Sequence, residues 1–259
     1  MSFQQKQINR RKSLVTLGLG FPAAAVGLSG CRSLKRSPKE LKADFVVIGG
    51  GLGGCAAALS ALRSGLSVIM TEETDWIGGQ LTSQGVPPDE HKWIERFGCT
   101  RTYRELRNAI RNHYRKHYPL TPAARGNINL NPGSGSVSRL CHEPRVALAC
   151  LEAMLRPFVA SGKLTLLRET IPTAVETDND EINSVEVLDL RKNSHLVLHG
   201  RYFADATELG DLLPLAKCEH VTGTEGKLAT GELHMPEHAS PKNQQAFTMC
   251  FAIDHVEGE

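Results

Sequence analysis

Three glycines and one glutamate have the spacing of residues that bind a dinucleotide. Gly49, Gly51 and Gly54 form a G-x-G-x-x-G pattern after a short apolar run, and Glu72 ends a second run about 20 residues further on. The first glycine permits a tight turn, the second lets the backbone approach a pyrophosphate, and the third lets a helix pack closely. Glu72 could accept hydrogen bonds from the adenosine ribose. We therefore predict a dinucleotide site, the alternative being a glycine-rich turn in an ordinary α/β protein.

The residues around the glycines predict the βαβ unit that would position them. Residues 45–48 suit a buried parallel strand, 55–66 a small-residue helix rich in alanine, and 67–72 the second strand. Cys55 opens the helix against the glycine turn, where we expect it to be a small packed residue. The positive N-terminal end of the helix would point at the phosphates.

The composition is that of a soluble globular protein with one large or two modest domains. The chain has 259 residues, of which 41% are hydrophobic and 22% charged, and a net charge of +2. It has no basic stripe with interleaved aromatic residues, so nucleic acid is not expected as a partner. His113 and His117 could share a helix face, but the sequence offers no third ligand, so no metal is predicted. Apart from Cys31, the cysteines form no C-x-x-C pair, and whether they form disulfides stays open.

Residues 1–31 are interpreted as an export signal. Arg10 and Arg11 form a twin-arginine pair, a weakly apolar stretch follows, and the segment up to Cys31 resembles the bacterial lipoprotein cleavage box, in which the cysteine is lipidated. Residues 32–43 would be a polar tether, and lipid at Cys31 would anchor the protein on the periplasmic side of the membrane. The alternatives are a chance cysteine after a signal peptide and an N-terminal membrane helix. The twin-arginine route moves proteins already folded, often with cofactors inserted, which suits a tightly held dinucleotide.

The remaining elements alternate and then become antiparallel. An irregular stretch at 74–99 is long enough to be functional. Helices are predicted at 103–118, with arginine and lysine outside the apolar face, and at 144–160, with a loop at 121–138 between them. Strands are predicted at 163–167, 171–176, 182–190, 196–198 and 201–204, with a further strand-like run at 246–253. The middle strands predict an antiparallel meander inserted into a parallel sheet.

Four separated motifs, in this order, resemble those of the FAD-dependent oxidoreductases of the glutathione-reductase-like superfamily. They are the glycine fingerprint, Asp75-Trp76-Ile77-Gly78-Gly79-Gln80, Cys141-His142-Glu143-Pro144, and Ala204-Asp205-Ala206-Thr207-Glu208-Leu209-Gly210-Asp211. The resemblance covers residues 44–255. More narrowly, the last three motifs resemble an FAD-dependent oxidoreductase family often found among bacterial exported proteins. It implies an α/β fold, a Rossmann-like FAD-binding parallel sheet with a meander insertion. It also implies an oxidoreductase that moves hydride or electrons between a small organic substrate and FAD.

The resemblance also implies which residues contact FAD. Gly49, Gly51 and Gly54 would contact the pyrophosphate, and Glu72 the adenosine ribose. Gly78, Gly79 and Gln80 would run along the pyrophosphate and flavin side. Ala206, Thr207, Gly210 and Asp211 would approach the cofactor where the chain returns.

The return segment departs from the superfamily pattern at one position. The superfamily usually has glycine directly after Ala-Thr, whereas this chain has Glu208 there. A helix start would also explain the segment, with Thr207 as the N-cap and Glu208 and Asp211 in the first turn.

Cys141, His142 and Glu143 are the candidate catalytic residues. Most removals of hydride from carbon next to a hydroxyl or amine need an acid or a base, and these reactive side chains stand together before Pro144. Alternatively, Glu143 and Pro144 simply begin a helix while Cys141 packs.

Residues 44–259 are expected to be an incomplete FAD-binding domain. In this superfamily a substrate domain and a last flavin-binding segment normally follow, so the resemblance implies that this chain is an N-terminal portion. Two other functions stay open, a truncated nucleotide-binding remnant without turnover and an NAD-dependent oxidoreductase, for which Glu72 is equally suitable. The meander and the Asp205-Ala206-Thr207 return disfavour NAD. The sequence predicts neither the substrate, the electron acceptor nor the oligomeric state.

Overall fold

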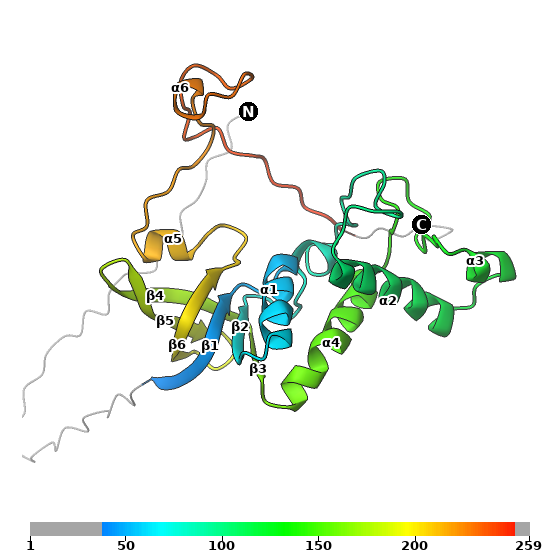
Figure 1. Ribbon diagram of the computed structural model, residues 1–259, viewed down its shortest axis with the longest axis horizontal. Coiled ribbons are helices and arrows are strands. Elements are labelled where there is room, and N and C mark those ends of the chain that lie inside the picture. The colour runs from blue at the N-terminus through cyan, green and yellow to red at the C-terminus, as the bar shows by residue number, and fades with distance from the viewer. Residues whose placement is uncertain (1–37, 252–259) are drawn as a thin grey trace, which may run out of the picture. The chain divides into compact units, whose positions relative to one another are not determined.

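The computed structural model describes residues 38–251, which contain one six-stranded mixed sheet with three long helices beside it (Figure 1). The strands are β1 (Lys39–Ile48), β2 (Val68–Glu72), β3 (Leu164–Arg168), β4 (Thr170–Asp178), β5 (Glu181–Asp189) and β6 (Ser194–Asp205). The helices are α1 (Leu52–Arg63), α2 (Arg101–His117), α3 (Pro122–Gly126), α4 (Pro144–Ala160), α5 (Leu212–Leu215) and α6 (Lys227–Thr230). The export signal predicted at residues 1–31 lies outside the described residues. Within 38–251, no helix is long and apolar enough to cross a membrane.

The sheet joins a parallel part to an antiparallel part through β6. Its strand order is β3-β2-β1-β6-β5-β4, and β1 pairs in parallel with both β2 and β6, while β4, β5 and β6 pair antiparallel. The predicted α/β fold, a parallel Rossmann-like sheet with an antiparallel meander, is therefore confirmed. The two runs predicted at 196–198 and 201–204 form one strand, because Gly200 continues the ladder opposite Ala43.

Strand β1 begins five residues before the predicted domain boundary at Asp44. Residues 39–43, which were expected to belong to the tether, pair with residues 196–200 of β6. In this stretch Leu41 and Ala43 alternate with charged side chains that stay exposed. The apolar residues occupy every second position, which is the pattern of a half-buried strand, but the charged residues between them make the segment resemble a polar tether in the sequence. Residues 39–43 therefore belong to the sheet, and a tether at 32–38 stays a prediction.

The centre of the sheet is buried on both faces. Val47, Val68 and Met70 pack against the helices, and α1, α2 and α4 supply most of that cluster. Val46, Ile48 and Ile69 face the other way and pack against apolar residues of β5 and β6. Successive strand residues point to opposite faces, so the uninterrupted apolar runs of β1 and β2 fill two cores at once.

Helix α2 buries two arginines that the sequence placed on its solvent side. Arg107 and Arg111 are 1% and 2% exposed, beside the expected apolar residues Leu106, Ile110 and Tyr114. Both guanidinium groups pair with Glu95, and Arg107 also pairs with Glu90. The Arg111 to Glu95 contact is bidentate, with distances of 2.5 and 3.0 Å. The sequence predicted arginine outside the apolar face but not the burial of these two, because their partners come from the irregular stretch and have no periodic signal.

This ion cluster fixes the irregular stretch to the helix layer. Burial acts to raise the pKa of Glu95, but the hydrogen bond from Arg111 and the charges of Arg107 and Arg111 hold that pKa below its ordinary value. The Glu95 carboxylate is therefore ionised at neutral pH. Removing one partner from such a cluster leaves buried charge without compensation, which is the costly case for buried pairs.

Three smaller expectations have different outcomes. Residues 246–251 form no strand, and Phe247, Met249 and Phe251 are exposed, so the strand-like run predicted there is wrong over its described part. The predicted loop at 121–138 contains the short helix α3, which begins after the Thr121 N-cap. Cys55 is buried as predicted, with 3% exposure. The cysteines of residues 38–251 are all free thiols.

We predict that Glu95→Ala destabilises the protein by about 3 kcal/mol, since Arg107 and Arg111 both lose their shared partner in the buried cluster. Glu105→Ala is the matched control, because Glu105 lies on α2 and pairs with Arg63 at the surface, where both side chains are nearly half exposed. That change should cost less than about 1 kcal/mol. Urea unfolding at pH 7 measures both. Equal losses for the two variants would contradict the role assigned to the cluster.

Candidate functional site

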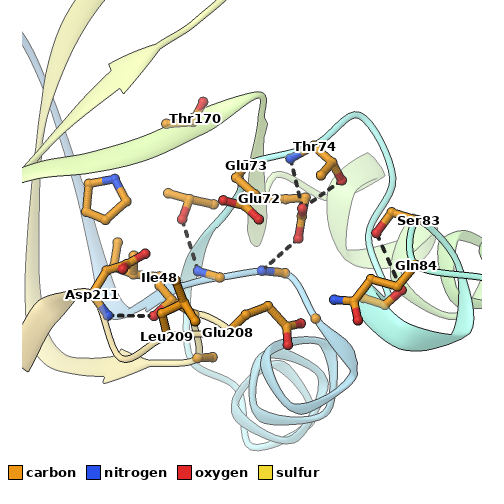
Figure 2. Close-up of a pocket in the computed structure, with 18 residues that line it drawn as sticks. Ile48, Glu72, Glu73, Thr74, Ser83, Gln84, Thr170, Glu208, Leu209 and Asp211 are labelled. Carbon is orange, nitrogen blue, oxygen red and sulfur yellow. Dashed lines mark hydrogen bonds between the residues drawn. The ribbon is translucent and has the colours of Figure 1, made fainter. Parts of the chain in front are cut away.

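A cavity of about 390 Å³ opens where β1, β2 and β6 end (Figure 2). Ile48 ends β1, Glu72 ends β2, and Ala206 follows β6, and all three line the cavity. Thr170 and Pro172 of β4 form another part of its wall. Ligands of open α/β sheets bind outside the carboxyl ends of the strands, so this cavity is the candidate site.

The glycine turn brings three backbone segments into direct contact. A Cβ atom on Gly49 would lie under 3.0 Å from the carbonyl of Ala206, and Gly49 has a φ of +104°. A Cβ atom on Gly54 would lie under 3.0 Å from the carbonyl of Gly49. No side chain fits at either position. Gly49 and Gly51 line the cavity, while Gly54 lies behind the turn and allows α1 to pack against it.

Glu72 ties the turn to the end of β2. It is 6% exposed, and its Oε2 accepts a hydrogen bond from the N–H of Gly50 at 3.1 Å. Its Oε1 accepts from the backbone N–H and the hydroxyl of Thr74, at 2.9 and 2.7 Å. Each carboxylate oxygen can accept about two hydrogen bonds, so Oε2 keeps one free position at the cavity. A ribose hydroxyl is a donor that suits this position.

The Gly78-Gly79 loop lies directly against the glycine turn. The N–H of Gly78 donates to the carbonyl of Gly50 at 2.8 Å, and both loop glycines have left-handed φ angles. Gly79, Ser83 and Gln84 line the cavity, as Figure 2 shows for Ser83 and Gln84. Gly78 instead packs toward Leu151 of α4, and Gln80 is exposed.

The return segment after β6 is a tight turn held by its own side chains. Asp205 accepts hydrogen bonds from the N–H and hydroxyl of Thr207, at 3.0 and 2.7 Å, and from the N–H of Leu212 at 2.9 Å. The Thr207 hydroxyl accepts from the N–H of Asp211 at 2.8 Å. Helix α5 begins only at Leu212, so the alternative of a helix capped by Thr207 is wrong. Ala206, Thr207 and Asp211 line the cavity, and Gly210 does not.

The cavity is acidic. Glu72, Glu73, Glu208 and Asp211 line it, and none of the described residues that line it is lysine or arginine. Burial raises the pKa of Glu73, and the negative charges of Glu72, Asp211 and Glu208 raise it further. Within residues 38–251, no group of three or more histidine, cysteine or acidic residues could hold a metal ion. Positive polarity among these lining residues is therefore limited to backbone N–H groups.

Cys141, His142 and Glu143 lie where the chain enters α4, and none of them lines the cavity. The N–H of Cys141 donates to Asn131, and Glu143 accepts from the Tyr118 hydroxyl at 2.8 Å. His142 has its Nδ1 3.1 Å from the Glu143 carbonyl, and burial lowers the pKa of its imidazole. The structure brings the three residues together at the helix start but not toward the candidate site. Their catalytic role stays a prediction.

Several lining residues were missed by the sequence analysis. Glu73 and Thr74 directly follow β2, and their position after the acidic strand end was a usable signal. Gly50 lies inside the glycine pattern at a variable position. Thr170 reaches the cavity because it starts β4 directly after β3, whose last residue pairs with Glu72 at the end of β2. No local sequence pattern indicates this pairing. The histidines His113 and His117 do share a face of α2, with ring centroids 4.7 Å apart.

Comparison with known families places most of the chain in one of them. The family described as FAD dependent oxidoreductase matches residues 44–259. No match was found among curated proteins. The match begins just before the glycine turn and includes every residue that lines the cavity.

Solved structures that resemble the chain include the following three. Glycerol-3-phosphate dehydrogenase from Bacillus halodurans, complexed with FAD, has a TM-score of 0.45 and 14% identity, covering 69% of this chain and 37% of that one. Sdh1 of Mycobacterium smegmatis, in complex with UQ1, has a TM-score of 0.41 and 15% identity, and the match covers 73% of this chain and 35% of that one. L-proline dehydrogenase from P. horikoshii has a TM-score of 0.35 and 16% identity, and the match covers 67% of this chain and 24% of that one. The chain thus spans less than half the length of these proteins.

We predict that Gly54→Ala destabilises the protein by about 2 kcal/mol or more, because its Cβ would overlap the Gly49 carbonyl. Gly53→Ala is the matched control in the same helix turn, where a Cβ meets no atom within 4 Å. That change should leave stability unchanged or raise it by up to ~1 kcal/mol, since alanine is the better helix former. Urea unfolding of the two variants measures the difference. Tolerance of alanine at both positions would show that the close approach is not required.

Proposed function

Because the chain belongs to the FAD-dependent oxidoreductase family, we propose that the cavity at the glycine turn holds the adenosine diphosphate half of FAD. The observation that carries this proposal is the combination of Gly51, which leaves the start of α1 open, with a free acceptor position on Glu72. A diphosphate beside Gly51 can accept from the first N–H groups of α1, which have no partner inside the helix. A ribose beside Glu72 can donate to its carboxylate.

The other residues implied by the family resemblance have roles that follow from their positions. Gly79 lies beside Gly51 and leaves the second side of the diphosphate position open. Ala206 and Thr207 close the cavity from the return segment, and Asp211 supplies an acceptor there. Gly54, Gly78 and Gly210 support the turns rather than line the cavity. Gln80 stays a predicted contact with the flavin side.

Bound FAD supplies the redox chemistry, accepting hydride or electrons from a small organic substrate at its isoalloxazine ring. The described residues bind and orient the cofactor. Cys141, His142 and Glu143 remain the proposed acid and base groups. A nucleotide-binding chain without turnover is the second candidate, favoured by the fact that none of these three lines the cavity. NAD is disfavoured because the family is defined by FAD dependence.

We predict that the purified chain retains FAD and is yellow, and that Gly51→Val removes this binding without unfolding the protein. The valine side chain would enter the cavity, where the only neighbour within 4 Å of its Cβ is the Glu208 carboxylate. The φ of −58° at Gly51 suits any residue. Absorption spectra after saturation with FAD and desalting measure retention, and circular dichroism checks the fold. A colourless wild-type chain that takes up no added FAD would refute the proposal.

We further propose, from the residues 1–31 alone, that the protein is exported by the twin-arginine route and lipid-anchored at Cys31 on the periplasmic side. The twin arginines, the short apolar stretch and the residues before Cys31 support this proposal. These residues lie outside the described part of the chain.

For the export signal, we expect that replacing both Arg10 and Arg11 by lysine keeps the protein in the cytoplasm. Cys31→Ser should allow export but abolish incorporation of labelled fatty acid. Arg32→Lys, just after the cleavage box, is the matched control and should behave as wild type. Cell fractionation and labelling measure these outcomes, and normal export of the double lysine variant would contradict the twin-arginine assignment.

A further inference from the structure

Glu208 extends over the open side of the glycine turn. Figure 2 shows its side chain reaching from the return segment across the first turn of α1. Its Oε1 atom lies 3.2 Å from the point that a Cβ on Gly51 would occupy and 2.8 Å from the same point on Gly79. The carboxylate therefore lies in the space that the two glycines leave open.

That space adjoins the N-terminal end of α1, a position that favours an anion. The N-terminal end of a helix carries a partial positive charge, and its first N–H groups point outward. Phosphate groups bind at such ends for this reason. A carboxylate here has the same sign of charge as the diphosphate and occupies part of the same volume, so the two exclude each other.

The backbone that carries Glu208 is fixed, whereas its side chain is not. Asp205 and Thr207 hold the turn through four hydrogen bonds, and the N–H of Ala206 donates to the Ile48 carbonyl at 2.7 Å. No hydrogen bond or ion pair within residues 38–251 engages the Glu208 carboxylate, and the residue is exposed. A ligand could displace the side chain by rotation without breaking the turn.

The remaining charges strengthen the competition. Glu72, Glu73 and Asp211 also line the cavity, and the described lining residues include no lysine or arginine to neutralise them. A diphosphate that enters meets negative side chains and only backbone groups of opposite polarity. Its affinity is therefore the difference between attraction to the helix end and repulsion by carboxylates.

We propose that Glu208 acts as an internal anion that competes with the diphosphate of the dinucleotide for the N-terminus of α1 and so sets its affinity. The inference rests on the proposed function, because it requires that the diphosphate lies at the glycine turn. It concerns ligands that carry the diphosphate and not those that fill only the adenosine part. Glu208 would therefore lower the affinity for ligands with a diphosphate relative to uncharged ligands such as adenosine.

Calorimetric titration of the whole chain with FAD, ADP and adenosine, after any bound FAD has been removed and its absence checked by absorption, tests the proposal. Glu208→Gln should bind FAD and ADP about fivefold more tightly than wild type, the size of one exposed charge interaction, and adenosine equally well. Glu208→Ala should give the same gain. The gain should shrink at high salt, because exposed charges are screened. Glu219→Gln is the control and should match wild type, because Glu219 is an exposed acid that follows α5 and does not line the cavity.

The outcomes separate the two proposals. If ADP binds to Glu208→Gln no more tightly, or less tightly, than to wild type, the competition is refuted while the cofactor site stands. If adenosine gains as much as ADP, the effect is one of shape and the inference is also refuted. If neither wild type nor variant binds FAD or ADP, the proposed function itself fails and the inference falls with it. Thermal unfolding of each variant confirms that the fold is unchanged.

Discussion

The close approach of three backbone segments at Gly49 is the constraint on which the site depends. The end of β1, the start of α1 and the return after β6 meet there, with no room for a single Cβ on Gly49 or Gly54. The Ala206 N–H also bonds to the Ile48 carbonyl, so the return segment is fixed directly to the glycine turn. Because β6 pairs with β1 along its length, the pairing that forms the sheet also brings the return segment to the glycine turn. A local sequence pattern thus determines a contact between residues more than 150 positions apart.

The second wall of the cavity depends on a different kind of interaction. The irregular stretch after β2 has little regular structure, yet it must hold Gly79 and Gln84 at the cavity. Its first part is fixed by the hydrogen bond from Gly78 to Gly50, and its later part by the ion cluster of Glu90 and Glu95 with α2. Buried ion pairs add little net stability, but they tolerate few alternative arrangements. Charge pairing thus joins the burial of Ile77 and Leu81 in holding a segment with little regular structure beside the cavity.

The sequence was sufficient wherever a local period or a fixed spacing carries the information. The strand ends at Ile48 and Glu72, the glycine turn and helix α4 were predicted closely, because each depends on residues near one another. Arg107 and Arg111 were misassigned, since charge normally marks a solvent face and their partners follow no period. Thr170 was missed because it reaches the cavity through the pairing of β2 with β3. Non-local pairing, rather than weak propensity, limited the prediction.

On the proposed function, the cavity would bind an anion although none of its lining residues is lysine or arginine. The first backbone N–H groups of α1 are fixed by the fold, so they would need no reorganisation when a ligand arrives, whereas the N–H groups of Gly49 and Gly50 already donate to Thr71 and Glu72. A lysine or arginine would raise affinity but would lose side-chain entropy on binding. The carboxylates act in the opposite direction: burial raises the pKa of Glu73, and the negative charges of Glu72, Asp211 and Glu208 raise it further. On the proposed function, a diphosphate would gain from the helix end and lose from Glu73 and Asp211, so its affinity would depend on how close it lies to each of them.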